Sequence, residues 1–246
     1  MPSFSCTSAT LKELPFFSTL SEAEVTKLLP FVQFRTYNRG MFVIASGSAI
    51  DGLYIIVSGR LKVVLQDERG RQFIVAQLGP KDLCGEALMQ ECRTGEAVEA
   101  VTQCELVYLP RKAVLECLER NPTAAMFILA VVTARLSDAR RKMGNLALET
   151  VGTRVLRVLL EQGHEEHGEW RVDVGAETIA ALVGASREMV SRVTKNLINR
   201  GVVRRYKRKL IVANRSRLAE YAQHSESRLE RNGSASSKAP YPQFAR

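Results

Sequence analysis

The sequence has no long hydrophobic run, few histidines and few cysteines. Its longest nearly apolar run, Ala124–Ala134, is about half of the ~20 residues that a membrane-spanning helix needs. The N-terminus, Met1-Pro2-Ser3-Phe4-Ser5, lacks the basic start and apolar core of a secretory signal. The five cysteines are scattered without a CxxC pair, which argues against a disulfide framework and a zinc site. We therefore expect a cytoplasmic protein with reduced thiols and no membrane segment.

Patterns for catalysis and metal binding are also missing. The chain has three histidines, and no arrangement of nucleophile, base and acid stands out. The sequence His-Glu-Glu-His at 164–167 has no accompanying ligands, so we expect a polar loop over 163–169 and no metal. These absences predict that the protein is not an enzyme.

Acidic residues are almost absent from one segment near the C-terminus. The 246 residues carry a net charge of +9, yet the segment from Arg187 to Arg217 holds eleven basic residues and one acid, Glu188. The remaining 215 residues therefore carry a net charge of −1. A solvated helix face usually mixes both signs, so this segment favours contact with nucleic acid.

The first half of the chain is typical of an antiparallel β-barrel. Eight of the sixteen glycines fall between residues 31 and 110, where they separate short β-branched and aromatic runs. Many short strands with glycine turns predict a jelly roll. Ser21 and Glu24 form a helix-capping pattern before it, and residues 67–70 have the composition of a hairpin tip. The expected strands are Phe42–Ile44, Leu53–Val57, Leu61–Leu65, Phe73–Leu78, Val98–Thr102 and Glu105–Leu109.

A long helix is expected to begin at Asn121-Pro122, because proline is favoured in the first turn of a helix. Its apolar residues recur with alternating steps of four and three, which is the seam of a two-helix coiled coil and predicts a parallel homodimer. The alternative is a helix packed on its own barrel. The seam consists of Ala125, Leu129, Val132, Leu136, Ala139, Met143 and Leu146.

The segment Glu177–Asn199 has the pattern of a helix-turn-helix. Gly184 suits a tight turn with positive φ, and Ser186 is a good N-cap for the second helix. Ile179, Ala180 and Val183 on the first helix, and Val190, Val193 and Leu197 on the second, are expected to be buried.

The other side of the second helix carries the groups that the major groove of DNA requires. Arginine pairs with guanine and glutamate accepts from cytosine. Strands over Val202–Arg205 and Leu210–Val212 would form a basic wing suited to phosphate contacts. The alternative, an ordinary helical hairpin in a core, does not explain the basic excess. The predicted DNA-binding residues are Ser186, Arg187, Glu188, Ser191, Arg192, Lys195 and Lys207.

A barrel, a long helix and a winged helix in this order resemble the CRP/FNR family of bacterial transcription regulators, over about residues 15–220. The motifs are Gly85-Glu86, the helix end Gly144-Asn145-Leu146-Ala147, and VGASREMVSR over residues 183–192. The resemblance implies a homodimer that binds palindromic double-stranded DNA with TGTGA-like half-sites through Arg187, Glu188 and Arg192. It also implies RNA polymerase as a partner.

The resemblance weakens at the effector site. Relatives that bind cyclic AMP have a Gly-Glu pair, an Arg-Ser pair for the phosphate and a Thr-Ser pair on the long helix for the base. The Arg-Ser slot falls here on Thr94-Gly95 or, one register earlier, on Arg93-Thr94, and the Thr-Ser pair on Ala139-Arg140. A missing arginine would leave a buried phosphate uncompensated. We expect that cyclic AMP does not bind in its usual pose, with cyclic di-GMP or no nucleotide as equal alternatives. The predicted effector residues are Gly85, Glu86, Arg93, Thr94 and Arg140.

The fold class that follows is α+β, with an N-terminal antiparallel jelly-roll barrel, a long dimerisation helix and a C-terminal winged helix-turn-helix. The expected function is a homodimeric, sequence-specific DNA-binding transcription regulator controlled by a small effector. The alternatives are an architectural DNA-binding protein without an effector and a nucleotide-binding signalling adaptor. The expected domains are an N-terminal extension (1–14), a sensor barrel (15–120), the dimerisation helix (121–148), the winged helix (149–221) and a disordered tail (222–246).

Overall fold

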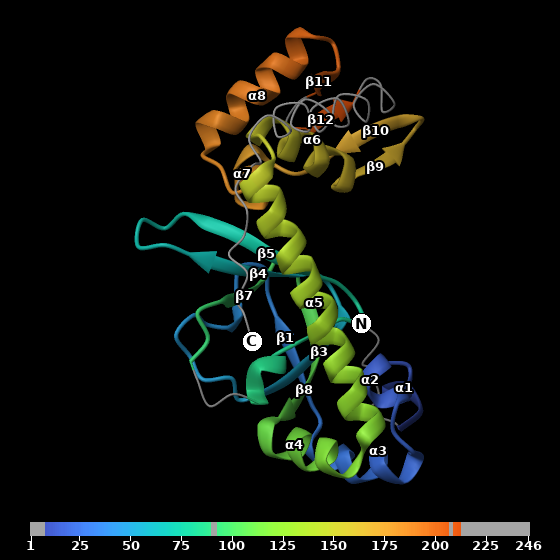
Figure 1. The fold of residues 1–246 in the computed structure, drawn as a ribbon. Coiled ribbons are helices and arrows are strands. Elements are labelled where there is room, and N and C mark those ends of the chain that lie inside the picture. The colour runs from blue at the N-terminus through green and yellow to red at the C-terminus, as the bar shows by residue number, and fades with distance from the viewer. Residues whose placement is uncertain (1–7, 90–92, 207–208, 213–246) are drawn as a thin grey trace, which may run out of the picture. The chain divides into compact units, whose positions relative to one another are not determined.

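The computed structural model describes residues 8–89, 93–206 and 209–212. The chain divides into two compact units, Met1–Ala139 and Arg140–Arg246 (Figure 1).

The first unit is a sandwich of two four-stranded antiparallel sheets, with strand orders β1-β8-β3-β6 and β2-β7-β4-β5. This arrangement confirms the predicted barrel. All six expected strands are present, and two short strands, β1 and β6, were missed. The strands are β1 (Gln33–Tyr37), β2 (Phe42–Ile44), β3 (Gly52–Ser58), β4 (Leu61–Gln66), β5 (Gln72–Leu78), β6 (Leu83–Cys84), β7 (Ala97–Ala100) and β8 (Cys104–Pro110).

Strands β3 and β8 are buried on both faces. Leu53 and Ile55 of β3 face a core shared with the helices, whereas Tyr54 and Ile56 face the space between the two sheets. This double burial explains why the two strands have continuous apolar sequences without a polar alternation. The hairpin between β4 and β5 turns at the expected tip, where the Asp67 carboxylate accepts from the backbone N–H groups of Arg69 and Arg71.

Three short helices cover the outer face of the first sheet: α1 (Ser8–Lys12), α2 (Pro15–Ser18) and α3 (Glu22–Leu28), followed by a 3-10 turn at Leu29–Phe31. The predicted capping box is present, with Ser21 and Glu24 bonded reciprocally at the start of α3. Leu11 and Leu14 are buried in the same core as α2 and α3. The described part of the expected extension is therefore packed into the first unit.

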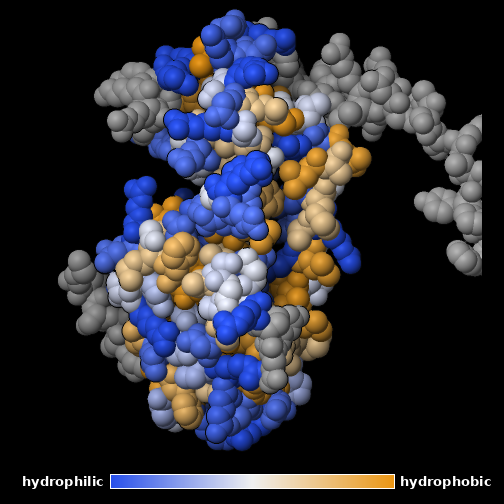
Figure 2. Space-filling model, turned by 90° about the vertical axis from the view of Figure 1, so that its left-hand side faces the viewer, coloured by the Kyte–Doolittle hydropathy of each residue, from blue (hydrophilic) through white to orange (hydrophobic). Residues whose placement is uncertain are grey.

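Helix α4 (Arg111–Arg120) precedes the long helix α5 (Pro122–Leu148), which begins at the predicted proline. One row of α5 side chains packs on the barrel: Ala124 and Ile128 are buried, and Phe127 and Val131 lie against the same core. A second row of α5 side chains is exposed. In Figure 2, hydrophobic side chains form a strip at the same height as α5 in Figure 1. The packing of the helix on its own barrel is therefore confirmed for the first row, and the coiled-coil seam stays a prediction. The exposed row includes Met126, Leu129, Val132, Leu136, Met143 and Leu146.

By length and composition alone, α5 could cross a membrane; it is the one such helix among the described residues. Its apolar side chains have another explanation, because one row is used by the barrel and the other follows the spacing of a coiled coil. The partly buried Arg135 also interrupts the apolar sequence and forms an ion pair. We therefore interpret α5 as a packing helix.

The second unit packs α6, α7 and α8 on a sheet of order β11-β12-β10-β9. The prediction of a polar loop over residues 163–169 is wrong, because residues 163–166 form strand β9 and pair with β10. Only His167 and Gly168, both with positive φ, make the turn. The elements are α6 (Val151–Glu161), β9 (Gly163–Glu166), β10 (Glu169–Val172), α7 (Ala176–Val183), α8 (Arg187–Asn199), β11 (Val203–Tyr206) and β12 (Lys209–Val212).

Trp170, the one tryptophan of the chain, joins β10 to α6. Its indole N–H donates to the Leu159 carbonyl over 3.1 Å. Its ring lies directly over Gly163, so closely that a Cβ at that position would overlap it. Gly163 is therefore required by the close approach of the ring to the backbone.

Candidate DNA-binding surface and effector site

The turn between α7 and α8 has the predicted geometry. Gly184 takes the left-handed conformation with φ of 64°, and the Ser186 hydroxyl accepts from the Met189 N–H over 3.2 Å. The turn thus ends one helix and begins the next within three residues, 184–186. Ser186, predicted as a DNA contact, uses its oxygen as the cap of α8.

The buried side of α8 holds the helix against the rest of the unit. Val190 and Leu197 are buried as expected, while Val193 is only half-buried. Thr194, which the sequence analysis did not single out, is 4% exposed. The burial of Thr194 was not predicted, because a polar residue is expected on the solvent-exposed side of a helix.

The other side of α8 is open. Arg187, Glu188, Ser191, Arg192 and Lys195 are all exposed, as the periodicity predicted. Hydrogen bonds from its own backbone N–H and from Ser186 hold the pKa of Glu188 below its usual range, so the carboxyl is ionised at neutral pH.

Met189 adds an apolar group to this surface, with 42% of its area exposed. An exposed methionine beside arginines suits contact with a thymine methyl group. The spacing alone did not reveal it.

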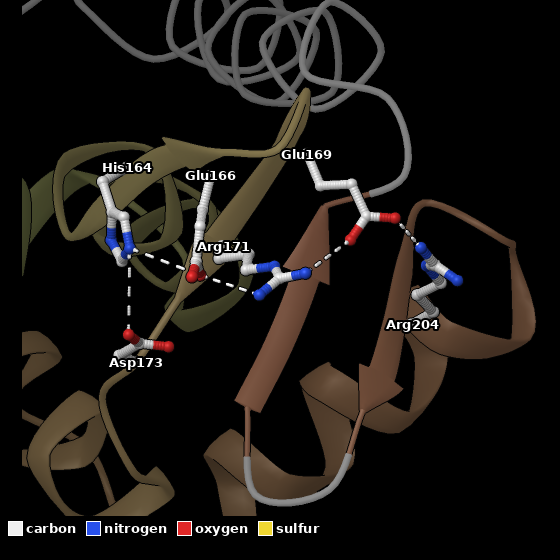
Figure 3. A network of polar contacts seen from close by, with 6 residues as sticks. All are labelled: His164, Glu166, Glu169, Arg171, Asp173 and Arg204. Carbon is white, nitrogen blue, oxygen red and sulfur yellow. Dashed lines mark hydrogen bonds and ion pairs between the residues drawn. The ribbon is translucent and has the colours of Figure 1, made fainter.

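The wing strands β11 and β12 are present, and Lys207 lies outside the described residues. Figure 3 shows a charged network on one face of their sheet. Arg171 pairs with Glu166 over 2.8 Å and with Glu169 over 3.4 Å, and Arg204 also pairs with Glu169. Arg204 is therefore held by a carboxylate, and the basic excess of this segment is not all available to an external anion.

His164 lies at the end of the same network, 3.8 Å from Asp173 and 4.0 Å from Glu166 (Figure 3). All three side chains are exposed by more than a third. Within the part of the chain that the structure describes, no group of three such residues has the geometry to hold a metal ion.

In the barrel, Gly85 and Glu86 lie at a sharp corner after β6. Gly85 has φ of 90°, and a Cβ there would overlap the Gly52 carbonyl oxygen, so this position requires glycine. The Glu86 carboxylate forms an ion pair with Arg135 of α5, whose guanidinium also donates to the Leu83 carbonyl. Burial lowers the pKa of Arg135. The predicted effector carboxylate is therefore already paired.

Arg135, the partner of Glu86 at this corner, is the contact that sequence reasoning missed. It follows the long apolar run and continues the row of α5 that packs on the barrel, through Ala124, Ile128 and Val131. A basic residue on the packed face of a helix requires a carboxylate partner, because an unpaired buried charge is costly. That signal was present in the sequence.

The other predicted effector residues have different surroundings. Arg93 is exposed and donates to the Gly47 carbonyl over 2.8 Å. Thr94 accepts from the Glu96 N–H with its hydroxyl. Arg140 is exposed and belongs to the second unit. The structure thus brings only Gly85 and Glu86 together at one corner, and the roles of Arg93, Thr94 and Arg140 stay predictions.

Cys84, next to Gly85, is fully enclosed, and burial raises the pKa of its thiol to about 12. The thiol is therefore protonated at neutral pH and packs as a small apolar group.

A sensor-type barrel joined to a winged helix with an exposed basic helix defines the class of ligand-responsive DNA-binding regulators. A family model for the cyclic nucleotide-binding domain matches residues 34–121, and one for the Crp-like helix-turn-helix domain matches residues 153–221. The chain is 32% identical to the cyclic AMP receptor protein of Thermus thermophilus, over 79% of this chain and 90% of that protein. It is 33% identical to a CRP-like cAMP-activated global transcriptional regulator of Mycobacterium tuberculosis, over 81% and 91%.

The fold agrees with solved structures. A regulator of the CRP/FNR family from Eubacterium rectale superposes with a TM-score of 0.75 at 21% identity, covering 86% of this chain and 98% of that one. The c-di-GMP responsive regulator CLP of Xanthomonas campestris gives 0.71 at 24% identity, covering 79% and 100%. The chain belongs to the CRP/FNR family of DNA-binding transcription regulators, which confirms the predicted family and fold class.

Proposed function

We propose that the protein is a homodimeric regulator that recognises a palindromic DNA sequence through α8 and responds to an effector in its barrel. The observation that carries this proposal is the division of α8 into two sides. Val190, Thr194 and Leu197 fix the helix, and the opposite side exposes two arginines, a lysine and a glutamate. The surface is thus presented on a rigid element, as base recognition requires.

The dimer is proposed from the exposed row of α5. Leu129, Val132 and Leu136 are exposed by 55%, 40% and 49% in the single chain. They follow the four-three spacing of a two-stranded coiled coil, and a second α5 would bury them. Two subunits would then present two copies of α8 to the two halves of a palindrome.

The effector is proposed to be a nucleotide, since the barrel matches the cyclic nucleotide-binding domain. Relatives named above respond to cyclic AMP or to cyclic di-GMP. In this chain the slot for the phosphate holds Thr94, whose hydroxyl is bonded to the backbone of Glu96, and Arg93 reaches Gly47 instead. These contacts support our expectation that cyclic AMP does not bind in its usual pose. RNA polymerase as a partner and a cytoplasmic location are part of the same proposal.

Fluorescence anisotropy tests the DNA part of the proposal, with TGTGA palindromes and scrambled duplexes of equal length. We expect tighter binding to the palindrome, and equal binding would indicate an architectural protein instead. No binding at low salt would favour a signalling adaptor.

Titration of cyclic AMP and of cyclic di-GMP into the protein–DNA complex tests the barrel. A change in DNA affinity identifies the effector. Micromolar binding of cyclic AMP that Arg93→Ala abolishes would contradict our expectation about its pose.

A further inference from the structure

The end of α5 and the turn of the helix-turn-helix are joined by one side chain, Arg154 of α6. Its Nε donates to the Val183 carbonyl over 2.9 Å, and its Nη1 donates to the Glu149 carbonyl over 2.7 Å. The same Nη1 lies 3.4 Å from the Leu146 carbonyl. All these groups belong to the second unit, and Arg154 is half-buried among them.

The acceptors are the carbonyls at the ends of two helices. Val183 is the last residue of α7, Leu146 lies in the last turn of α5, and Glu149 directly follows α5. Carbonyls in a last helical turn lack partners within their helix, and they form the negative end of the helix dipole. A guanidinium between two such ends is therefore favourable to both helices at once.

The local sequence aims Arg154 at this position. Thr150 caps α6 by accepting from the Thr153 N–H over 3.2 Å, and Thr153 is buried. The cap fixes the first turn of α6. The side chain of Arg154, which follows Thr153, is thereby directed toward the ends of α5 and α7. Arginine suits this place because its N–H groups lie in a fixed plane and point in separate directions, whereas a lysine ammonium is a single point.

We propose that Arg154 is a positioning residue for DNA recognition, which fixes the direction of α7 against the end of the dimerisation helix. The turn after Val183 leads directly into α8, with Gly184 and Ser186 in fixed conformations. Fixing α7 therefore fixes where α8 lies relative to the end of α5. This inference rests on the proposed function, in which two copies of α8 must meet both halves of a palindrome.

The consequence is a difference between two DNA probes. A dimer bound to a full palindrome gains affinity because its second binding event is intramolecular, and this gain depends on fixed geometry. A duplex with one half-site needs no such geometry. Loss of Arg154 should therefore lower the ratio of palindrome affinity to half-site affinity rather than lower both equally.

The test uses the full-length dimer and a duplex selected by the wild-type protein from a random pool, together with its half-site version. Arg154→Met keeps the apolar stem and removes the donors; we expect the affinity ratio to fall about tenfold. The matched control is Arg157→Met, which removes another guanidinium of α6, one whose ion pair goes to the Glu149 carboxylate. Because this ion pair is made with the residue after α5 rather than with α7, we expect lower stability but a ratio within about twofold of wild type.

Arg154→Lys separates bridging from charge. If a positive charge near the helix ends were sufficient, lysine would restore the ratio, and that result would overturn the proposal. An unchanged ratio in Arg154→Met, with or without a lower melting temperature, would show a structural role only. Circular dichroism verifies that each variant is folded.

Hydrogen exchange without DNA provides an independent measurement. In Arg154→Met we expect faster exchange of the amides over residues 146–152 and 181–187, with smaller changes in the barrel strands. Unchanged exchange in both segments would overturn the bridge itself. If the wild-type protein selects no duplex, the proposed function fails, and this measurement still decides whether Arg154 joins the two helix ends.

Discussion

The two candidate sites, the corner of the barrel and the open side of α8, use their charged side chains in opposite ways. At the corner of the barrel, Glu86 is paired with Arg135 inside the unit. On α8, Arg192 and Lys195 are exposed and form no ion pair among the described residues. The proposed DNA-binding surface thus has exposed charges, whereas an effector that binds at Glu86, as predicted, would have to compete with Arg135. Four sets of substitutions would test this comparison.

The largest effect is expected from Leu136→Glu on the exposed row of α5. A carboxylate on each chain would face its copy across the seam and prevent dimer formation. We expect a monomer in sedimentation equilibrium and a loss of about a hundredfold in affinity for a palindromic duplex. Ser137→Glu, on an exposed neighbour off the seam, is the control. A dimeric Leu136→Glu protein would contradict the proposed seam.

Gly85→Ala tests the packed corner of the barrel. The new Cβ would overlap the Gly52 carbonyl at a backbone φ of 90°, and we expect a loss of about 3 kcal/mol in the free energy of unfolding. Gly201→Ala, in the second unit, has a φ of 68° but open space, so it should cost about 1 kcal/mol. Gly95→Ala, open and without positive φ, should be nearly neutral. Urea denaturation measures all three, and equal losses would contradict the steric explanation.

Arg187→Ala tests base recognition by the open side of α8. We expect a loss of about 1–3 kcal/mol in binding free energy with a relaxed base preference, because arginine pairs with guanine. Lys207→Ala should weaken all duplexes similarly and lower the salt dependence. Anisotropy with specific and scrambled duplexes checks both. An equal loss on the two duplexes for Arg187→Ala would argue against direct base contact.

The smallest effects are expected at the two helix caps, Ser21 and Ser186. Replacing either serine by alanine should cost about 1 kcal/mol in the stability of its unit. Only Ser21 belongs to a capping box, in which its hydrogen bonds lower the pKa of Glu24. The stabilising contribution of Glu24 is therefore present above its unfolded pKa and is lost as the pH falls through its lower folded value.

Stability measured between pH 7 and pH 3 checks the first cap. The difference between wild type and Ser21→Ala should shrink toward acid pH. A difference that grows on acidification would contradict the sign of the pKa shift.

Most of the fold was predictable because its signals are local. Glycines mark the turns of the barrel, a proline begins α5, and Gly184 and Ser186 mark the turn before α8. Strands β1 and β9 were missed because polar and charged residues dominate them. Their pairing with β8 and β10 overrides a weak local preference.

The two candidate sites also differed in how far the sequence predicted them: local signals were visible and long-range contacts were not. The exposed side of α8 follows from periodicity, because neighbours on a helix face are close in sequence. The pairing of Glu86 with Arg135 joins residues 49 positions apart, and only the folded chain brings them together. The position of Arg135 on the packed face of α5 indicated that it needs a carboxylate partner, but spacing could not identify Glu86 as that partner.

The position of Trp170 gives the second unit its own optical signal. The chain has one tryptophan, and its indole is held against Gly163 and bonded to Leu159 within that unit. Intrinsic tryptophan emission therefore reports the winged helix alone, while the six tyrosines, including Tyr54 and Tyr108 in the barrel, do not contribute when excitation is restricted to the indole. The unfolding of the DNA-binding half can thus be followed separately in the intact, unlabelled protein.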